Sequence, residues 1–234
     1  MKKQLWILTL LLFGAALITL RIISYDKPES ILTIKENAAS REIDRLFRNM
    51  EIIKVPRISP PVDFSLLDLY SKKVILSDFK GKIVFLNFWA TWCPTCREEM
   101  PSMQRLYTRF KDKDFAMVAV SMNESASVVK KFFKDYNLTF TSLLDAEGEI
   151  GARFGVRAIP MTFILDRDGG IIGKAFGPRK WDSEKSIALF EHLINNTVRN
   201  ANIDEHQQKK SISSHSVKPG TGTGNTAVNS AFAY

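Results

Sequence analysis

Phe88-Trp89-Ala90-Thr91-Trp92-Cys93-Pro94-Thr95-Cys96-Arg97-Glu98-Glu99-Met100-Pro101 is the stretch that decides the fold. Directly before the cysteines, the run 83–89 is almost wholly apolar, which is typical of a strand buried on both faces of a sheet. A helix is expected from Cys93, with an apolar inner face made of Met100, Met103, Leu106, Tyr107 and Phe110. A buried strand that leads directly into an amphipathic helix indicates an α/β fold.

Cys93 and Cys96 are the only two cysteines among 234 residues. Structural zinc needs about four Cys or His ligands, and the three histidines lie far downstream near the C-terminus. Haem attachment requires His after the second cysteine, where this chain has Arg97. A chain of this length also needs no disulfide staple. We therefore interpret the cysteines as a redox pair and expect neither a metal nor any cofactor beyond their disulfide.

The position of the pair explains its chemistry. Backbone N–H groups and the helix dipole stabilise an anion at a helix N-terminus, so Cys93 can be a thiolate near neutral pH. Cys96 lies one turn further and deeper, within disulfide reach, and is expected to resolve the mixed disulfide. Pro94 suits the first helical turn, where a missing N–H costs nothing.

The remaining elements of the domain follow from apolar periodicity and turn residues. Asn137 is expected to end the second amphipathic helix in a left-handed conformation. The expected elements are a leading hairpin (64–67 and 74–76), a second buried strand (115–120), a second helix (128–136), a short strand and helix (142–144 and 149–154), an antiparallel pair (161–165 and 171–176) and a last helix (183–197).

The N-terminus carries a targeting segment. Lys2 and Lys3 precede an uncharged run that ends at Leu20, followed by Arg21. This pattern fits a signal peptide or a signal anchor, and we favour the uncleaved anchor over residues 1–25, with everything downstream outside the cytoplasm.

Residues 26–59 are expected to form a spacer that contains one amphipathic helix. Apolar residues at i, i+3, i+4 and i+7 define that helix: Ile43, Leu46, Phe47 and Met50. It is interpreted as a stalk, as a helix docked on the domain, or as a segment lying on the membrane surface. The domain is expected at 60–200, and the Ser-, Gly- and Thr-rich segment 201–234 as a disordered tail.

Composition excludes some partners. Hydrophobic residues make up 45% of the chain and charged residues 25%, which are ordinary values for a globular protein. The net charge of +8 is spread along the sequence, without a Lys/Arg run interleaved with aromatics. Nucleic acid is therefore not an expected partner.

The segment 88–101 resembles the active site of the TlpA/ResA/CcmG family, which are membrane-tethered thioredoxin-like proteins, several of them serving cytochrome c maturation. Segments 76–82, 155–160 and 177–179 also resemble the family, and the resemblance runs from Pro60 to about Thr197. It implies a thioredoxin fold, in which a central mixed sheet is flanked by helices, with an N-terminal β-hairpin and an inserted strand–helix unit. It further implies an extracytoplasmic thiol–disulfide oxidoreductase of the protein-disulfide reductase type.

The resemblance also implies roles for single residues. Cys93 matches the nucleophile, Cys96 the resolving cysteine, and Glu99 the acidic residue proposed to help proton transfer. Pro160 matches a cis-proline that faces the disulfide, and Ile159 before it pairs with the substrate backbone. The remaining residues expected to contact substrate are Trp92, Pro94 and Thr95, and Pro101 matches a proline that kinks the first helix.

Two positions bear on mechanism and substrate. Asn87 stands where cytoplasmic thioredoxins carry a buried aspartate, so that proton route is missing and the case for Glu99 is stronger. Met161 follows the expected cis-proline, where cytochrome-specific members often carry an acidic residue. Apocytochrome c and general protein disulfides therefore both remain candidate substrates.

Partners and rival functions complete the expectations. The partners are protein thiols or disulfides, a transmembrane electron donor and the membrane that holds the anchor. The rival enzyme is a thiol peroxidase, since peroxiredoxins share the fold, but Cys93 follows Trp-Ala-Thr-Trp and Cys96 would quench a sulfenate at once. The rival without enzymatic activity is a redox-silent module that binds client proteins, which the intact Cys93, Cys96 and Pro160 argue against.

Overall fold

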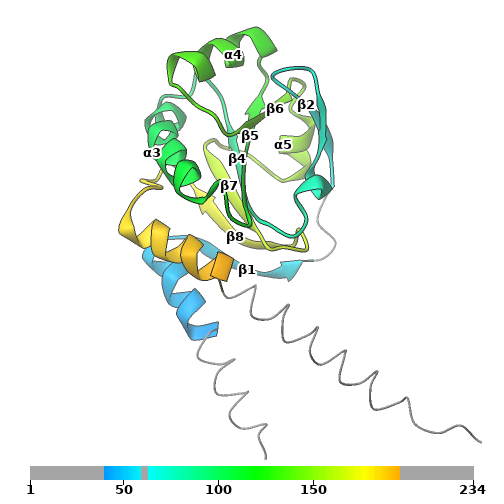
Figure 1. Ribbon diagram of the computed structural model, residues 1–234. Coiled ribbons are helices and arrows are strands. Elements are labelled where there is room, and N and C mark those ends of the chain that lie inside the picture. Colours follow the sequence, from blue (N-terminus) through cyan, green and yellow to red (C-terminus); the bar gives the residue numbers. More distant parts are fainter. Residues whose placement is uncertain (1–39, 59–62, 196–234) are drawn as a thin grey trace, which may run out of the picture. The chain divides into compact units, whose positions relative to one another are not determined.

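The computed structural model describes residues 40–58 and 63–195, and their strands form one eight-stranded sheet in the order β1-β8-β7-β4-β5-β6-β2-β3 (Figure 1). The strands are β1 (Ile53–Ile58), β2 (Ser65–Asp68), β3 (Lys73–Ile75), β4 (Ile83–Trp89), β5 (Phe115–Met122), β6 (Thr141–Asp145), β7 (Met161–Leu165) and β8 (Ile171–Phe176). The helices are η1 (Leu76–Phe79), α3 (Pro94–Phe110), α4 (Ala126–Asp135), α5 (Glu149–Arg153) and the helical segments 40–49 and 184–195.

The strand that precedes the cysteines lies inside the sheet. β4 is buried at every position, pairs parallel with β5 and pairs antiparallel with β7. The sheet is therefore mixed, and the prediction of a central mixed sheet flanked by helices is confirmed. Because β4 has a neighbour on each side, the Cys-x-x-C turn at its end is held by a rigid support.

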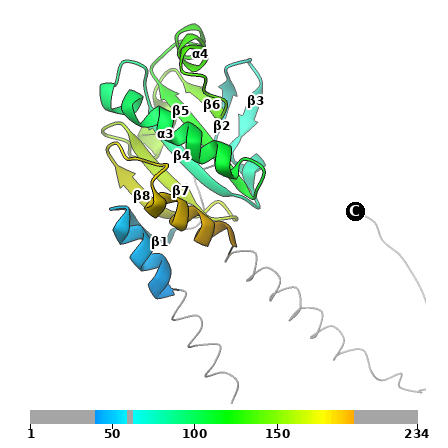
Figure 2. The same cartoon turned by 60° about the vertical axis from the view of Figure 1, so that its left-hand side comes forward.

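Alternate residues of β4 face two hydrophobic layers. Ile83, Phe85 and Trp89 join the layer formed with α3, α4 and the segments 40–49 and 184–195. Val84, Leu86 and Phe88 join a second layer with η1 and α5. Figures 1 and 2 show the helices on the corresponding sides of the sheet. Asn87 shares the face of Phe85 and Trp89, so its amide is directed towards α3.

The leading strands extend the sheet beyond the parallel pair β5–β6. β2 pairs antiparallel with β3, with Ser65 opposite Ile75, and pairs antiparallel with β6 through Leu67 and Leu144. β6 is followed by α5, so a short strand and a short helix do lie between α4 and β7, where the sequence placed an inserted unit. β6 lies in the sheet, and α5 packs in the second hydrophobic layer, on the face opposite α3.

The segment 40–58 corrects the expected domain boundary. These residues fall within the spacer expected at 26–59, but Phe47 is 1% exposed in the main core, and β1 pairs antiparallel with β8 as an additional edge strand. The amphipathic helix is therefore docked on the domain, which begins before residue 60. Apolar periodicity located the helix, whereas β1 is a short edge strand that its own sequence does not reveal. We call helix 40–49 with β1 the N-terminal extension.

Several local predictions are confirmed. Asn137 has a φ of 53° after α4, and β7 pairs antiparallel with β8. The last helix begins at residue 184, one residue after its predicted start, and Ser183 Oγ accepts a hydrogen bond from the Ser186 N–H over 3.3 Å there. No helix within the described ranges is both long enough and apolar enough to cross a bilayer. The anchor expected at 1–25 and the tail expected at 201–234 lie outside the described residues.

Candidate active site

The two cysteines occupy the turn between β4 and α3. Cys93 is the residue before the first turn of α3, with extended backbone angles, and its Sγ accepts a hydrogen bond from the Cys96 N–H over 3.2 Å. Pro94 stands in the first turn, as predicted, where no intrahelical donor is lost. The helix N-terminus thus directs at least one backbone donor at the sulfur, which favours a thiolate there once the pair is reduced.

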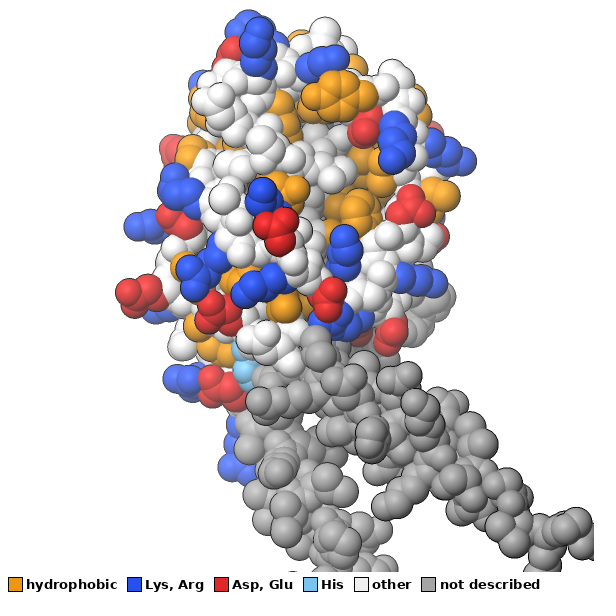
Figure 3. Space-filling model, viewed as in Figure 1, with side chains coloured by type: hydrophobic (Ala, Val, Ile, Leu, Met, Phe, Trp, Pro, Cys, Tyr) orange, Lys and Arg blue, Asp and Glu red, His pale blue; other side chains and the backbone are white. Residues whose placement is uncertain are grey.

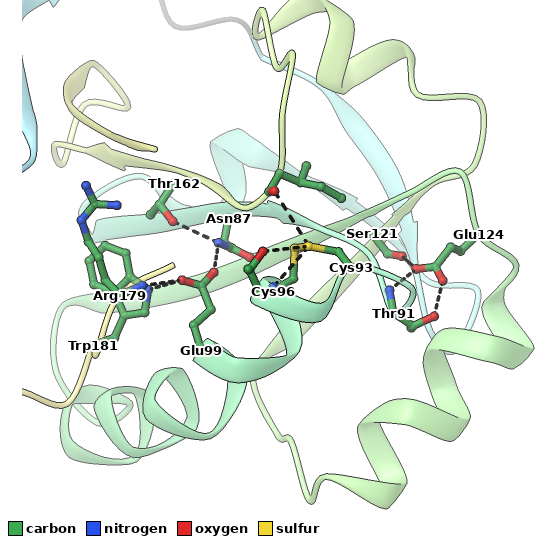
Figure 4. The surroundings of a disulfide bond; sticks show 12 residues. Asn87, Thr91, Cys93, Cys96, Glu99, Ser121, Glu124, Thr162, Arg179 and Trp181 are labelled. Atoms are coloured by element: carbon green, nitrogen blue, oxygen red, sulfur yellow. Dashed lines mark hydrogen bonds between the residues drawn. A yellow bond between two sulfur atoms is a disulfide. The ribbon is translucent and has the colours of Figure 1, made fainter. Parts of the chain in front are cut away.

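Cys93 and Cys96 form a disulfide, with Cα atoms 5.3 Å apart (Figure 4). Cys93 is 5% exposed and Cys96 is 0% exposed. Only the first cysteine therefore has any surface from which a substrate sulfur can approach. This asymmetry agrees with the predicted roles of nucleophile and resolving cysteine.

The residues next to Cys93 in the turn are exposed. Trp92 is 64% exposed, and Pro94 and Thr95 are also exposed, with the Thr95 hydroxyl 3.5 Å from Cys93 Sγ. The three residues predicted to contact substrate thus lie together beside the reactive sulfur. Their roles in binding stay predictions.

The loop before β7 faces the disulfide from the other side. The Ile159–Pro160 peptide bond is cis, as the resemblance implied, and the carbonyl oxygen of Ile159 lies 3.8 Å from Cys93 Sγ. Pro160 is buried and Ile159 is partly exposed. The Ile159 backbone thus lies next to the reactive sulfur, and its pairing with substrate backbone stays a prediction.

Glu99 lies one turn after Cys96 on α3 and is 2% exposed. Its Oε1 accepts a hydrogen bond from Asn87 Nδ2 over 3.0 Å, and its Oε2 accepts from Trp181 Nε1 over 2.9 Å and from the Arg179 N–H over 3.2 Å (Figure 4). The neighbouring Glu98 is exposed. Of the two acidic residues, only Glu99 is buried and hydrogen-bonded within the domain interior, and its role in catalysis stays a prediction.

Opposing effects set the protonation of Glu99. Burial raises the pKa of this carboxyl to about 7, while the hydrogen bonds from Trp181, Arg179 and Asn87 and the charge of Arg179 act to lower it. A carboxyl with a pKa near neutrality can both accept and donate a proton at physiological pH. Position and protonation therefore support the predicted proton transfer.

Sequence reasoning missed the loop that completes this site. Arg179 and Trp181 follow β8 and provide two of the three donors to Glu99. Ser102 joins the loop to α3, because its Oγ accepts from the Trp181 N–H over 3.0 Å. The family-like segment 177–179 was the only signal in the sequence, and it did not indicate which side chain this loop would meet.

Glu124 was also missed. Its carboxylate accepts hydrogen bonds from the Thr91 N–H over 2.8 Å, from the Thr91 hydroxyl and from the Ser121 hydroxyl over 2.8 Å (Figure 4). Thr91 lies two residues before Cys93, so Glu124 fixes the turn that presents the nucleophile. A contact between residues 33 positions apart leaves no local pattern in the sequence.

The charged side chains visible on the surface do not form a patch of one sign. On the face seen in Figure 3, acidic and basic side chains are interspersed with apolar ones.

Within residues 40–58 and 63–195, no group of three or more His, Cys, Asp or Glu side chains is arranged to hold a metal ion.

Comparison with known proteins identifies the family. Thiol-disulfide oxidoreductase ResA from Bacillus thuringiensis subsp. konkukian is 41% identical over 131 residues, which is 56% of this chain and 75% of the relative. ResA from Bacillus subtilis is 39% identical over 132 residues, which is 56% of this chain and 72% of the relative. This chain belongs to the TlpA/ResA/CcmG-like family. It is a thiol–disulfide oxidoreductase.

Further matches agree with this family. Residues 59–174 match the AhpC/TSA family. A solved thiol:disulfide interchange protein of the thioredoxin family from Chlorobium tepidum aligns with a TM-score of 0.52 and 27% identity, over 60% of this chain and 99% of that protein. The thioredoxin fold implied by the sequence is thus confirmed. The AhpC/TSA match begins at residue 59, so helix 40–49 and all of β1 lie outside it.

Proposed function

We propose that this family member is a protein-disulfide reductase whose Cys93–Cys96 dithiol acts on protein substrates outside the cytoplasm. The observation that carries the proposal is the asymmetric disulfide: Cys93, at the N-terminus of α3, keeps 5% of its surface exposed, whereas Cys96, one turn further along the helix and one turn before Glu99, is 0% exposed. A nucleophile that a substrate sulfur can reach, with a resolving thiol buried behind it, is suited to react with a large substrate and then to release it.

The proposed reaction transfers two electrons. The Cys93 thiolate attacks one sulfur of the substrate disulfide, and the other substrate sulfur leaves as a thiolate and takes a proton. Cys96 then gives its proton to Glu99 and attacks Cys93 Sγ, which releases the second substrate sulfur as a thiolate. That thiolate takes up a proton as Glu99 releases the one it received from Cys96. The substrate thus gains two electrons and two protons, and the enzyme holds the disulfide seen in the structure.

Glu99 is suited to the second step. Cys96 is 0% exposed, so solvent cannot take its proton directly, and Glu99 is the buried carboxyl one turn away on the same helix. With a pKa of about 7, the carboxylate form is well populated near neutrality and can receive that proton.

The location and the electron source are also proposed. Lys2 and Lys3 before an apolar run support an N-terminal anchor with the domain outside the cytoplasm. A dithiol in an oxidising compartment needs a continuing supply of electrons. We therefore propose a transmembrane electron donor, with protein disulfides, including those of apocytochrome c, as the class of substrate.

The test of the reaction is insulin reduction in the presence of dithiothreitol, beside peroxide consumption. The wild-type protein should accelerate insulin reduction, and Cys93→Ala should abolish the acceleration. Preferential consumption of peroxide would instead make the protein a thiol peroxidase. The absence of both activities in the intact dithiol would leave a redox-silent binding module.

The nucleophile and the substrate can be assigned with the same protein. Cys93 should be alkylated at least ~10-fold faster than Cys96 in the reduced protein at pH 7, because only Cys93 combines exposure with the helix N-terminus. Equal rates would contradict the assignment. A Cys96→Ala variant should accumulate mixed disulfides on Cys93, and mass spectrometry of the trapped partners would decide whether apocytochrome c is among them.

The proposed topology has a separate test. A periplasmic reporter fused after Tyr25 should be active, and the protein should remain with the membranes after a high-salt wash. Release of a soluble form lacking roughly the first 20 residues would show cleavage of the segment instead.

A further inference from the structure

Arg179 holds the N-terminal extension to the end of β8. Its guanidinium donates hydrogen bonds to the carbonyl oxygens of Met50 and Glu51, each over 2.9 Å. The same group donates to the carbonyls of Phe176 over 2.7 Å and Gly177 over 2.8 Å. Met50 and Glu51 directly follow helix 40–49, where carbonyl groups lack intrahelical donors and a cation is favourable. One side chain thus joins the helix end to the loop that follows β8.

The backbone of the same residue reaches the redox site. The Arg179 N–H donates to Glu99 Oε2, the oxygen that also accepts from Trp181 Nε1. Ser102 keeps this loop on α3, since its Oγ lies 3.3 Å from the Arg179 carbonyl and accepts from the Trp181 N–H. The loop therefore cannot follow the extension away from α3 without weakening the contacts to the carboxylate.

We propose that Arg179 is a positioning residue that links the N-terminal extension to Glu99, so that docking of the extension sets the protonation of the redox site. The inference rests on the proton role proposed above for Glu99. It concerns a part of the chain that lies wholly outside the AhpC/TSA match, because that match begins at residue 59. The extension therefore contributes to the core and is also connected, through Arg179, to the carboxylate of Glu99.

The charges around Glu99 fix the direction of the effect. Arg179 is the charged group that faces the carboxylate from the loop after β8, and Cys96, one turn earlier on α3, is held in the disulfide and does not titrate in the oxidised protein. Asn87 and Trp181 contribute neutral donors, and Glu51 of the extension acts on Arg179. Because the Arg179 charge favours the carboxylate, its loss should raise the pKa of Glu99 above about 7.

The experiment follows the side-chain carboxyl carbon of Glu99 by ¹³C NMR during a pH titration of the oxidised full-length protein. The resonance is assigned by its absence in Glu99→Gln. Arg179→Met removes the charge and the donors but keeps a long stem, and Arg179→Lys keeps the charge with a single donor group. We expect Arg179→Met to raise the midpoint by at least ~0.5 pH units and Arg179→Lys by less than about half of that shift.

Arg167→Met is the matched control. Arg167 likewise donates to backbone carbonyls, those of Gly81 and Ile194, and pairs with Asp114 over 2.9 Å. It lies in the turn between β7 and β8, and no contact joins it to Glu99 among the described residues. Its loss should lower stability but leave the Glu99 midpoint within ~0.2 pH units of the wild-type value.

Amide hydrogen exchange supplies the second readout. Exchange of the amides in 40–58 should become faster in Arg179→Met and stay unchanged in Arg167→Met. Faster exchange with an unchanged Glu99 midpoint would overturn the proposal, because Arg179 would then stabilise the docked extension without affecting the protonation of Glu99. A shifted midpoint with unchanged exchange would also overturn it, since the extension would play no part.

Failure of the proposed function gives a different result. Normal insulin reduction by Glu99→Gln would remove the proton role of Glu99, yet the NMR midpoints would still report whether Arg179 links the extension to this carboxyl.

Discussion

Asn87 Nδ2 donates a hydrogen bond to Glu99 Oε1 over 3.0 Å, from the interior of β4 to α3. The same amide group donates to the Thr162 hydroxyl over 3.0 Å, and Asn87 Oδ1 has no hydrogen-bond partner within the described part of the chain. The Asn87 amide nitrogen thus donates to both Thr162 and Glu99, and the hydrogen bond to Glu99 favours the ionised carboxylate. Hydrogen bonding favours the carboxylate while burial favours the acid, and the balance lies near neutrality.

The first prediction concerns stability against pH. Burial raises the pKa of Glu99 from 4.5 to about 7, so the native protein keeps a proton that the unfolded chain has already lost. The free energy of unfolding should therefore fall as the pH rises from ~4.5 to ~7, by about 1.4 kcal/mol per unit and about 3 kcal/mol in all. Below this pH range Glu99 is protonated in both the native and the unfolded state, so the free energy of unfolding is not lowered. Above it Glu99 is ionised in both states, and the free energy of unfolding stays at its lowered value.

Urea unfolding of wild type and Glu99→Gln across this range is the measurement. In the variant the free energy of unfolding should no longer show the decrease with pH that comes from Glu99, because a glutamine does not titrate. Glu98→Gln, on the same helix but exposed, should keep the wild-type slope. An identical slope in wild type and Glu99→Gln would show that Glu99 titrates normally in the folded protein.

The second prediction places an acid beside Glu99. Asn87→Asp replaces a donor by a carboxyl group in a buried site, and two carboxylates at this distance cannot both ionise cheaply. The variant should be destabilised by about 2–4 kcal/mol at pH 8 and by much less at pH 5. Asn87→Ala loses the hydrogen bond without adding a charge, so its destabilisation should vary little with pH. Thermal unfolding at both pH values tests this, and a pH-independent loss in Asn87→Asp would contradict it.

The third prediction concerns the turn before the nucleophile. Glu124 accepts hydrogen bonds from the Thr91 N–H and hydroxyl and from Ser121, so Glu124→Ala leaves these donors without a partner. We expect a loss of about 1–3 kcal/mol in the free energy of unfolding and insulin reduction slowed several-fold. Glu147→Ala, at an exposed position, should change neither. Wild-type values in Glu124→Ala would show that the turn keeps its form without this carboxylate.

Much of the fold was predictable because most of its strands and helices are marked by patterns of neighbouring residues in the sequence. β4 was visible as a continuous apolar run and α3 as an amphipathic pattern after a Cys-x-x-C turn, and both lie as expected. β1 was missed because an edge strand acquires its identity from its partner β8. The docking of helix 40–49 stayed open for a similar reason, since an apolar face does not specify what covers it.

The candidate site divides in the same way. Cys93, Cys96 and the Ile159–Pro160 pair were located from motifs, and the structure brings them together. Residue identity suggested Glu99, but its donors come from β4 and from the loop after β8, 12 to 82 positions away. A proton site assembled from such distant segments is visible only after folding.

The last prediction is the direction of electron flow. A strong oxidant requires a greatly stabilised thiolate, because this stabilises the reduced form and raises the potential. At Cys93 the α3 N-terminus supplies some of this stabilisation, through a helix dipole and the Cys96 N–H. Glu99 opposes it, because its carboxylate is buried within about a turn of the pair, and Arg97 is engaged with the Tyr136 hydroxyl over 3.0 Å. The potential should therefore lie nearer to about −270 mV than to about −120 mV.

Equilibration with glutathione at defined ratios measures this potential. Glu99→Gln removes the opposing charge and should raise the potential by about 20–40 mV at pH 8, where the wild-type carboxyl is ionised. Glu98→Gln serves as the control and should change it less, because its exposed charge is screened by solvent. A wild-type potential above about −150 mV would make the protein a disulfide-forming oxidant. A value near the expected one means that the dithiol would stay reduced in an oxidising compartment only while a donor supplies electrons, which is why the proposed function includes one.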